Sequence, residues 1–97
     1  MNKSYEKINA DNPQKRLGVI GIFIYELEKS KEVNEILSKF YLNIKARMGL
    51  PLKDGSKKMA IISLIFEGTT DELGALTGRL GKIEGVSCRS FLAKNRR

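Results

Sequence analysis

The order in which strand-like and helix-like apolar patterns follow one another constrains the fold of this chain more than any other feature. Residues 17–25 form a dense apolar run, with two glycines inside it, that is typical of a strand packed on both faces. After Ser30, which is predicted to be an N-cap, apolar residues recur at the three-and-four spacing of an amphipathic helix. This helical stripe consists of Val33, Ile36, Leu37, Phe40 and Ile44.

The next two strands are predicted to form a hairpin. Apolar runs at 46–50 and 59–66 flank a polar segment, 51–57, which contains the dipeptide Asp54-Gly55. An Asp-Gly pair between two strand-like runs is a strong signal of a tight turn. We therefore expect the two runs to pair with each other.

The second helix has a clear predicted start. Thr69 and Glu72 match a capping box, in which the side chain of each residue bonds to the backbone N–H of the other. Either Gly81 or Gly85 is expected to end this helix, and a last strand follows at 86–92. The residues that the helix is expected to bury are Leu73, Leu76, Leu80 and Ile83.

The predicted order is thus strand, helix, strand, strand, helix, strand. It indicates an α+β protein with a ferredoxin-like βαββαβ sandwich, in which a four-stranded antiparallel sheet carries both helices on one face. The domain is expected to span residues 16–93. A flexible polar N-terminal arm at 1–15 and a basic C-terminal tail at 94–97 are expected to flank it.

Two of the predicted strands are apolar on both faces. In the first strand Val19 and Phe23 alternate with Ile20, Ile22 and Ile24; in the strand at 59–66, Met59, Ile61 and Ile65 alternate with Ile62, Leu64 and Phe66. Two helices cover only one face of such a sheet, so a monomer would leave a large apolar patch in water. We expect a homo-oligomer, either a dimer or a tetramer. The alternative is that the N-terminal arm folds over the open face.

The residue inventory argues against catalysis and metal binding. The 97 residues include no histidine and one cysteine, so a single subunit lacks the usual nucleophile–base pairs and zinc ligands. Cys88 is expected to act as a small buried side chain. We predict no catalytic residue, no metal site and no cofactor, and hence a protein that is not an enzyme.

Nothing in the sequence indicates export or membrane insertion. No apolar run approaches the roughly 20 residues of a membrane span. The polar residues 1–16 lack the apolar core of a signal peptide. We therefore expect a cytoplasmic protein without a membrane partner.

The net charge of +7 leaves two interpretations open. Basic residues gather in the predicted hairpin, at Lys53, Lys57 and Lys58, and in the tail, at Arg96 and Arg97. Solvated charge that promotes solubility accounts for them without any partner. The alternative is a protein that contacts nucleic-acid phosphates directly, which is disfavoured because no aromatic residues for base stacking are interleaved with the cations.

Glycines mark one side of the second predicted helix. Gly74, Gly78 and Gly81 project within a narrow arc roughly opposite the leucine stripe. Interior helical glycines cost about 1 kcal/mol each relative to alanine. The strip is therefore a candidate for close approach by a partner or a ligand, unless Gly81 is only a C-cap and the other two are merely tolerated.

Five short segments resemble the regulator family of the iron-only hydrogenase system. They are RLGVIGI at 16–22, RMGLP at 47–51, ISLI at 62–65, GTTDE at 68–72 and ALTGRLG at 75–81. The resemblance implies an ACT-like domain, similar to the C-terminal domain of the nickel-responsive repressor, with side-by-side pairing of sheets. It also implies a regulatory role, in which the domain senses a small molecule or a protein partner and acts on transcription or assembly in a hydrogenase system.

The chain departs from those relatives in ways that limit the comparison. The nickel repressor binds its metal largely through histidine, which this sequence lacks. Residues 1–15 are too short and too polar to supply a DNA-reading ribbon-helix-helix arm. ACT domains commonly hold amino acids near a glycine-containing turn after the first strand, whereas residues 26–29 here contain no glycine.

The segment 47–49 is our main candidate for an effector site. Arg47 offers a planar fork of donors suited to a carboxylate or phosphate, and Gly49 inside a strand indicates a bulge or a close backbone approach. Because so small a sandwich fills its single core, we expect the pocket at a seam between subunits. Alternatively, Arg47 pairs with Asp71 or Glu72 of a neighbouring subunit. The full set of effector or interface candidates is Arg47, Met48, Gly49, Asp71, Gly74 and Gly78.

Overall fold

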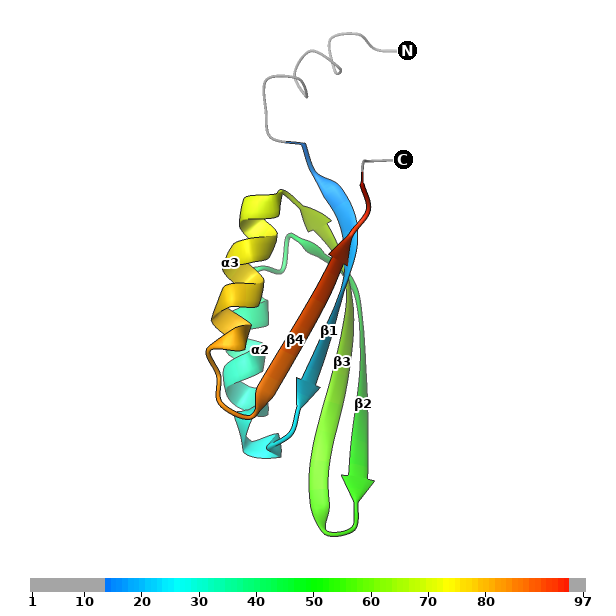
Figure 1. The fold of residues 1–97 in the computed structure, drawn as a ribbon, viewed down its shortest axis with the longest axis vertical. Helices are drawn as coiled ribbons and strands as arrows, with labels where there is room; N and C mark the ends of the chain where they lie inside the picture. Colours follow the sequence, from blue (N-terminus) through cyan, green and yellow to red (C-terminus); the bar gives the residue numbers. More distant parts are fainter. Residues whose placement is uncertain (1–13, 95–97) are drawn as a thin grey trace, which may run out of the picture.

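A computed structural model describes residues 14–94 of the chain (Figure 1). The elements in chain order are β1 (Arg16–Ile24), the 3-10 helix η1 (Leu27–Lys29), α2 (Ser30–Lys39), β2 (Ile44–Asp54), β3 (Lys57–Gly68), α3 (Thr70–Gly81) and β4 (Val86–Leu92). The strands form one antiparallel sheet in the order β2-β3-β1-β4. Both helices lie on the same side of this sheet (Figure 1). The predicted ferredoxin-like α+β fold is confirmed.

The predicted arm and tail fall largely outside this part of the chain. Only Gln14 and Lys15 of the arm, and only Lys94 of the tail, are among the described residues. None of the helices formed by residues 14–94 is long and apolar enough to cross a membrane.

The core lies between the two helices and one face of the sheet. It forms because every second residue of β1 and β3 is a large apolar side chain on the helix side. Gly18 lets β4 approach β1 closely, since a Cβ atom there would lie 2.6 Å from Leu92 Cδ2 and 2.7 Å from the Phe91 carbonyl oxygen. The buried core residues are Ile20, Ile22, Ile24, Val33, Leu37, Ile62, Leu64, Phe66, Leu76, Leu80 and Ile83.

The opposite face of the sheet, which we call the open face, is not covered by any helix of residues 14–94. Val19 and Phe23 of β1 point to this face and are 45% and 40% exposed, whereas Ile20 and Ile22 are fully buried on the other. The predicted division of these side chains between two faces is therefore confirmed. The expectation that β1 is packed on both faces is not met among the described residues, because both helices of residues 14–94 lie on the same side of the sheet (Figure 1).

The first helix is shorter than its apolar stripe predicts. Phe40, with φ −113° and ψ 24°, leaves the helical conformation, and Ile44 instead begins β2. Ser30 is also not the N-cap, because η1 already turns the chain at Lys29, and Ser30 is the first residue of the helix. The apolar period continues past the helix because Phe40 and Ile44 still pack against the core from the connecting turn and the next strand.

The hairpin is longer than predicted. β2 and β3 pair as far as Asp54 and Lys57, so the segment expected to be a loop is mostly strand, and only Gly55 and Ser56 make the turn. Gly55 has a φ of +64°, which glycine adopts without strain. Pro51 is tolerated because β2 is an edge strand. Since β1 ends opposite Ala60, the tip of the hairpin extends past the rest of the sheet (Figure 1).

The second helix follows its prediction closely. The Thr69 hydroxyl accepts from the Glu72 backbone N–H at 3.1 Å, and a Glu72 carboxylate oxygen accepts from the Thr69 N–H at 2.9 Å. The helix ends at Gly81 with Lys82 as C-cap, and Gly85, with a φ of +83°, makes the turn into β4. The predicted capping box is confirmed.

Candidate effector site

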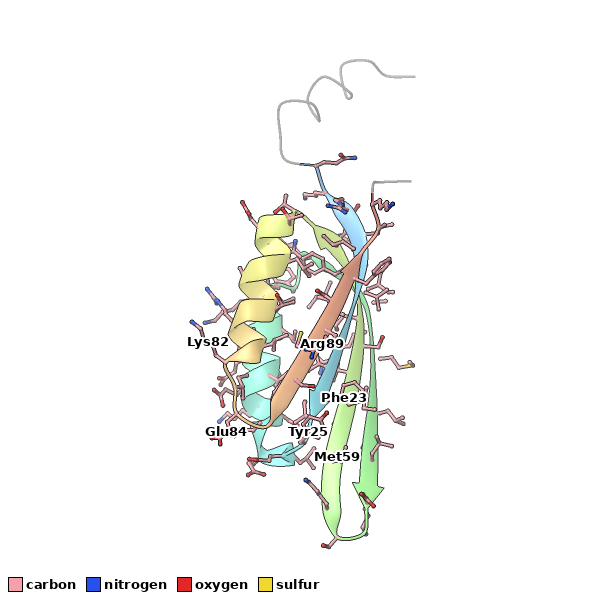
Figure 2. All side chains as sticks on the ribbon, in the orientation of Figure 1. Phe23, Tyr25, Met59, Lys82, Glu84 and Arg89 are labelled. Carbon is pink, nitrogen blue, oxygen red and sulfur yellow. The ribbon has the colours of Figure 1, made fainter. Side chains whose placement is uncertain are left out.

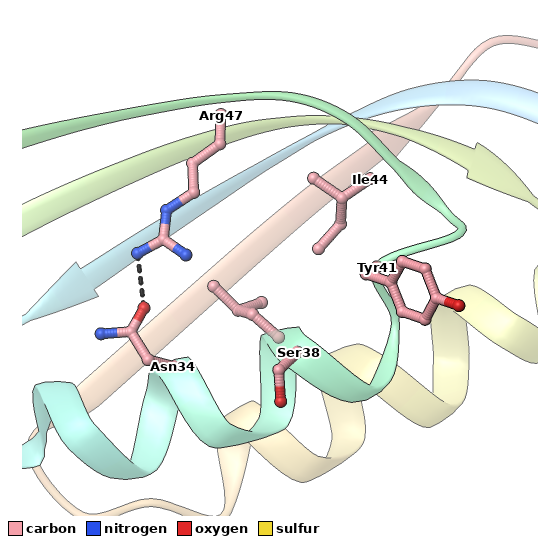
Figure 3. A pocket seen from close by; sticks show the side chains of 6 residues that line it. Asn34, Ser38, Tyr41, Ile44 and Arg47 are labelled. Atoms are coloured by element: carbon pink, nitrogen blue, oxygen red, sulfur yellow. Dashed lines mark hydrogen bonds between the residues drawn. The ribbon is translucent and has the colours of Figure 1, made fainter.

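A shallow groove of about 290 Å³ lies between α2 and the edge strand β2 (Figure 3). It exists because the helix-side positions of β2 beyond Ile44 are Arg47, Gly49 and Pro51, which do not cover the flank of α2 with a large apolar side chain. All three of these residues are exposed to solvent. The groove is lined by Asn34, Leu37, Ser38, Tyr41, Ile44 and Arg47.

Arg47 spans the groove from β2 to α2. One of its terminal nitrogens, Nη2, donates a hydrogen bond to the Asn34 side-chain oxygen (Figure 3). Asn34 is a neutral partner, so the guanidinium charge is not balanced by it. A guanidinium has five N–H donors, and a single bond to an amide leaves several of them for an anion.

The rest of the groove combines an apolar floor with polar walls. Leu37 is only 2% exposed and Ile44 is half-buried, and together they form the floor between the helix and the strand. The Ser38 hydroxyl donates to the Glu35 carbonyl at 2.8 Å, which leaves its oxygen as an acceptor at the wall. The Tyr41 hydroxyl points away from the Arg47 guanidinium (Figure 3), so it is the ring that adjoins the groove.

This arrangement can bind but offers no catalytic device. A small molecule with a carboxylate or phosphate and a short apolar part matches a single cation beside an apolar floor. Nothing that lines the groove is a nucleophile paired with a base, since the hydroxyls of Ser38 and Tyr41 have no histidine, lysine or carboxylate among the other lining residues.

The structure separates the predicted residues 47–49 between two faces. Arg47 pairs across the hairpin with the core residue Leu64 and points to the helix side, whereas Met48 pairs with Ser63 and points to the open face, where it is 69% exposed. Gly49 is on the helix side, where a Cβ atom would meet nothing within 4 Å. Arg47 and Met48 therefore do not belong to one pocket within a single chain.

The candidates on α3 lie far across the sheet from those on β2. Asp71, Gly74 and Gly78 are exposed, and α3 packs against β4 and α2 rather than against β2. β4 and β2 form the two opposite edges of the sheet. Gly74 and Gly78 have open space around them, so the predicted smooth strip exists, but it is not part of the α2–β2 groove.

Glu72, the alternative partner of Arg47, has other roles within its own chain. Besides capping α3, its carboxylate accepts from the Asn43 side-chain amide at 3.2 Å. That bond ties the start of α3 to the turn that precedes β2.

The basic residues of the alternative nucleic-acid interface divide between the two sides of the hairpin. Lys53 and Lys58 lie directly opposite each other across the two strands, and Lys57 lies opposite Asp54 on the other side. All three lysines are exposed. Arg96 and Arg97 lie outside the described residues.

Asn34, Ser38 and Tyr41 were not predicted from the sequence to belong to the site. Their spacing of four and three residues places them along one flank of a helix, which is the only signal the sequence contains. That flank has the composition of an ordinary solvated surface. It becomes a wall only because β2 runs beside it.

Cys88 and the carboxylates form no metal site in this part of the chain. Among residues 14–94 no three cysteine, aspartate or glutamate side chains gather as metal ligands would. Cys88 is half-buried on β4, and this burial raises the pKa of its thiol, an effect that the nearby charge of Arg89 partly opposes.

Comparisons with known proteins agree with the fold and identify a family. Residues 16–90 match the TM1266-like family, described as "Iron-only hydrogenase system regulator, putative". The structure of protein TM1266 from Thermotoga maritima, described as uncharacterized, superposes with a TM-score of 0.77 at 36% sequence identity, over 84% of this chain and 100% of that one. No curated protein matches the chain significantly. The resemblance inferred from the sequence motifs is confirmed, and the chain belongs to this TM1266-like family.

Proposed function

We propose that the chain is a non-catalytic regulatory domain that binds a small anionic effector in the α2–β2 groove. The observation that carries the proposal is the Arg47 guanidinium, held by Asn34 above an apolar floor. A fixed arginine beside a small apolar hollow is a common way to recognise a carboxylate or phosphate. The family's description as regulators supports a binding role over a catalytic one.

The hydrogenase connection follows from family membership and is part of the proposal. In it, effector binding changes how the domain acts on the expression or assembly of an iron-only hydrogenase system. The groove lies at an edge of the sheet, so a bound ligand would contact both α2 and β2. Such a ligand would hold β2 in one position relative to α2, so binding would favour one conformation of the domain.

Binding of simple anions tests the groove directly. Succinate, benzoate and inorganic phosphate serve as probes, and amide chemical shifts are followed by NMR as each is titrated. We expect at least one probe to shift the Asn34 side-chain amide and the backbone amides of 44–47. Arg47→Ala should abolish these shifts, and Arg47→Lys should weaken them, because lysine keeps the charge but lacks the planar fork.

Lys39→Ala is the matched control. Lys39 is an exposed cation on α2 that does not line the groove, so its removal lowers the net charge by the same amount. The shifts should survive in this variant. If none of the probes perturbs the groove, or if Arg47→Ala and Lys39→Ala weaken binding equally, the effector site is not here.

A further inference from the structure

The open face carries an unusually large set of exposed apolar side chains. All four strands contribute, because most residues that alternate with the helix-side positions of β1, β2 and β3 are apolar, and β4 adds Phe91. Phe23 and Tyr25 stack with their ring centroids 6.2 Å apart, and Figure 2 shows both near Met59 toward the hairpin end of the sheet. The exposed apolar residues of the open face are Leu17, Val19, Phe23, Tyr25, Met48, Leu50, Leu52, Ile65 and Phe91.

The area of this face decides what kind of partner it fits. Each of its exposed residues is between 37% and 73% accessible. Because large side chains present about 150–250 Å² each, the set exposes on the order of 800 Å². The largest patch of a typical monomer covers about 300–600 Å². Each partner in a standard protein–protein interface contributes about 800 Å², which is the size of the whole open face.

The distribution of charge favours a second copy of the chain over an anionic surface. The centre of the face carries no charge. It is formed by two small uncharged residues, Gly21 of β1 and Ser63 of β3, which lie opposite each other. At the margins, positive and negative groups occur together: Glu67 is 3.9 Å from Lys45, and Asp54 lies opposite Lys57. A face with an uncharged centre and both signs at its rim suits an interface with a like surface. A nucleic acid or an anionic membrane would require an excess of cations there.

Arg89 is the charged residue that such an interface must accommodate. It lies beside Gly21, but on the edge strand β4, and its guanidinium already donates to the Cys88 carbonyl oxygen at 3.1 Å. A long side chain on an edge strand can keep its charged end in water while its stem is covered. Arg89 therefore need not be buried without a partner when the face is covered.

The centre of the face also has room for a partner's side chains. A Cβ atom at Gly21 would meet nothing within 4 Å. Its neighbour across the strands, Ser63, is small. By contrast Phe91 and Met48, on the two edge strands, are 73% and 69% exposed. The surface of the face is therefore recessed at Gly21 and Ser63 on the inner strands and raised at Met48 and Phe91 on the edge strands.

We propose that the open face is the interface of a homodimer, in which the sheets of two copies pack against each other face to face. This interface is independent of the effector site, because the α2–β2 groove lies on the opposite side of the sheet. Dimerisation leaves that groove accessible. In such a dimer two adjacent residues of β2 have different roles, because Arg47 lines the groove and Met48 lies in the interface.

Two lysine substitutions on the face and one away from it test the proposal in the full-length chain. Val19→Lys and Ile65→Lys place a charge on the two inner strands of the interface, far from the sheet edges, where it is costly. Leu42→Lys is the matched control, because Leu42 is 71% exposed but lies in the turn between α2 and β2. Sedimentation equilibrium at micromolar concentration gives the mass, and far-ultraviolet circular dichroism checks the fold.

We expect the wild type and Leu42→Lys to sediment at twice the chain mass of 10.9 kDa. Val19→Lys and Ile65→Lys should keep the native spectrum and dissociate at least about a hundredfold more readily, since an unpaired charge would be buried. A wild type with the mass of a single chain overturns the proposal, because no second copy then covers the face. A dimer that survives both face variants uses another surface and overturns it equally.

Discussion

Ile61 and Ile62 show how two adjacent residues of the same type acquire different roles. Ile62 is 4% exposed in the core, whereas Ile61 is half-buried on the open face. We expect Ile62→Lys to lose about 3–5 kcal/mol of stability, because it leaves an uncompensated charge in the core. Ile61→Lys should keep the native circular dichroism spectrum and instead weaken self-association. Equal losses of melting temperature in the two variants would contradict this division.

Gly18 and Gly21 of β1 also lie on opposite faces of the sheet and differ in the space around them. At Gly18 a Cβ atom would lie within 3 Å of β4, partly against a backbone oxygen, while at Gly21 it would meet open space. Gly18→Ala should destabilise the protein by about 1–3 kcal/mol through overpacking. Gly21→Ala should change stability by less than about 0.5 kcal/mol. Urea unfolding of both variants measures the difference, and a harmless Gly18→Ala would mean that β4 shifts freely.

The reactivity of Cys88 reports its surroundings. Burial raises the pKa of the thiol, and Arg89 lowers it by a smaller amount, so the net direction is upward. The folded protein therefore holds less of the reactive thiolate than the unfolded chain does at the same alkaline pH. The pH midpoint of alkylation by iodoacetamide should be higher for the native protein than for the chain in urea. Identical midpoints would contradict a net upward shift of the pKa of Cys88 in the folded protein.

Among the elements, α3 depends on its cap most clearly. Thr69→Ala removes the hydroxyl that accepts from the Glu72 N–H and should cost about 1 kcal/mol. Thr70→Ala is the control, because Thr70 is exposed and is the first residue of the helix rather than its cap. The comparison requires only the urea midpoints of the two variants. A loss as large in Thr70→Ala as in Thr69→Ala would mean that the cap is not the cause.

The capping box also shows which parts of the fold were predictable. Its two bonds join residues three apart, so the sequence alone specifies them. The end of α2 is different, because Phe40 and Ile44 continue an apolar period that serves the core from outside the helix. The length of the hairpin was likewise underestimated, since Pro51 disfavours an inner strand but is accepted at the edge that β2 occupies. Both errors arise where tertiary position overrides a local signal.

For the molecule as a whole, the lining of the candidate site was only partly predictable. Arg47 was chosen as a candidate because an arginine fork has a recognisable chemistry. Its neighbours Asn34, Ser38 and Tyr41 were not, since their role depends on β2 running beside α2. The alternation of a strand, by contrast, is a local rule. It correctly separated the core face from the open face before the packing was known, although it also separates Arg47 from Met48.

The net charge of +7 is a property of the whole molecule and allows a last test, against the alternative of direct nucleic-acid binding. Lys53 and Lys58 lie opposite each other at the tip of the hairpin, where like charges oppose pairing of the strands. If Lys53 and Lys58 contact phosphates, each should add about 0.9 to the magnitude of the slope of the logarithm of the binding constant against the logarithm of salt concentration. We instead expect only weak binding of duplex DNA, at low salt, that depends on total charge. The double variant Lys53→Ala/Lys58→Ala and the control Lys31→Ala/Lys39→Ala, exposed cations on α2, should then reduce the slope equally. Fluorescence anisotropy across a salt series measures both slopes, and a reduction confined to the hairpin variant would establish the hairpin as a nucleic-acid interface.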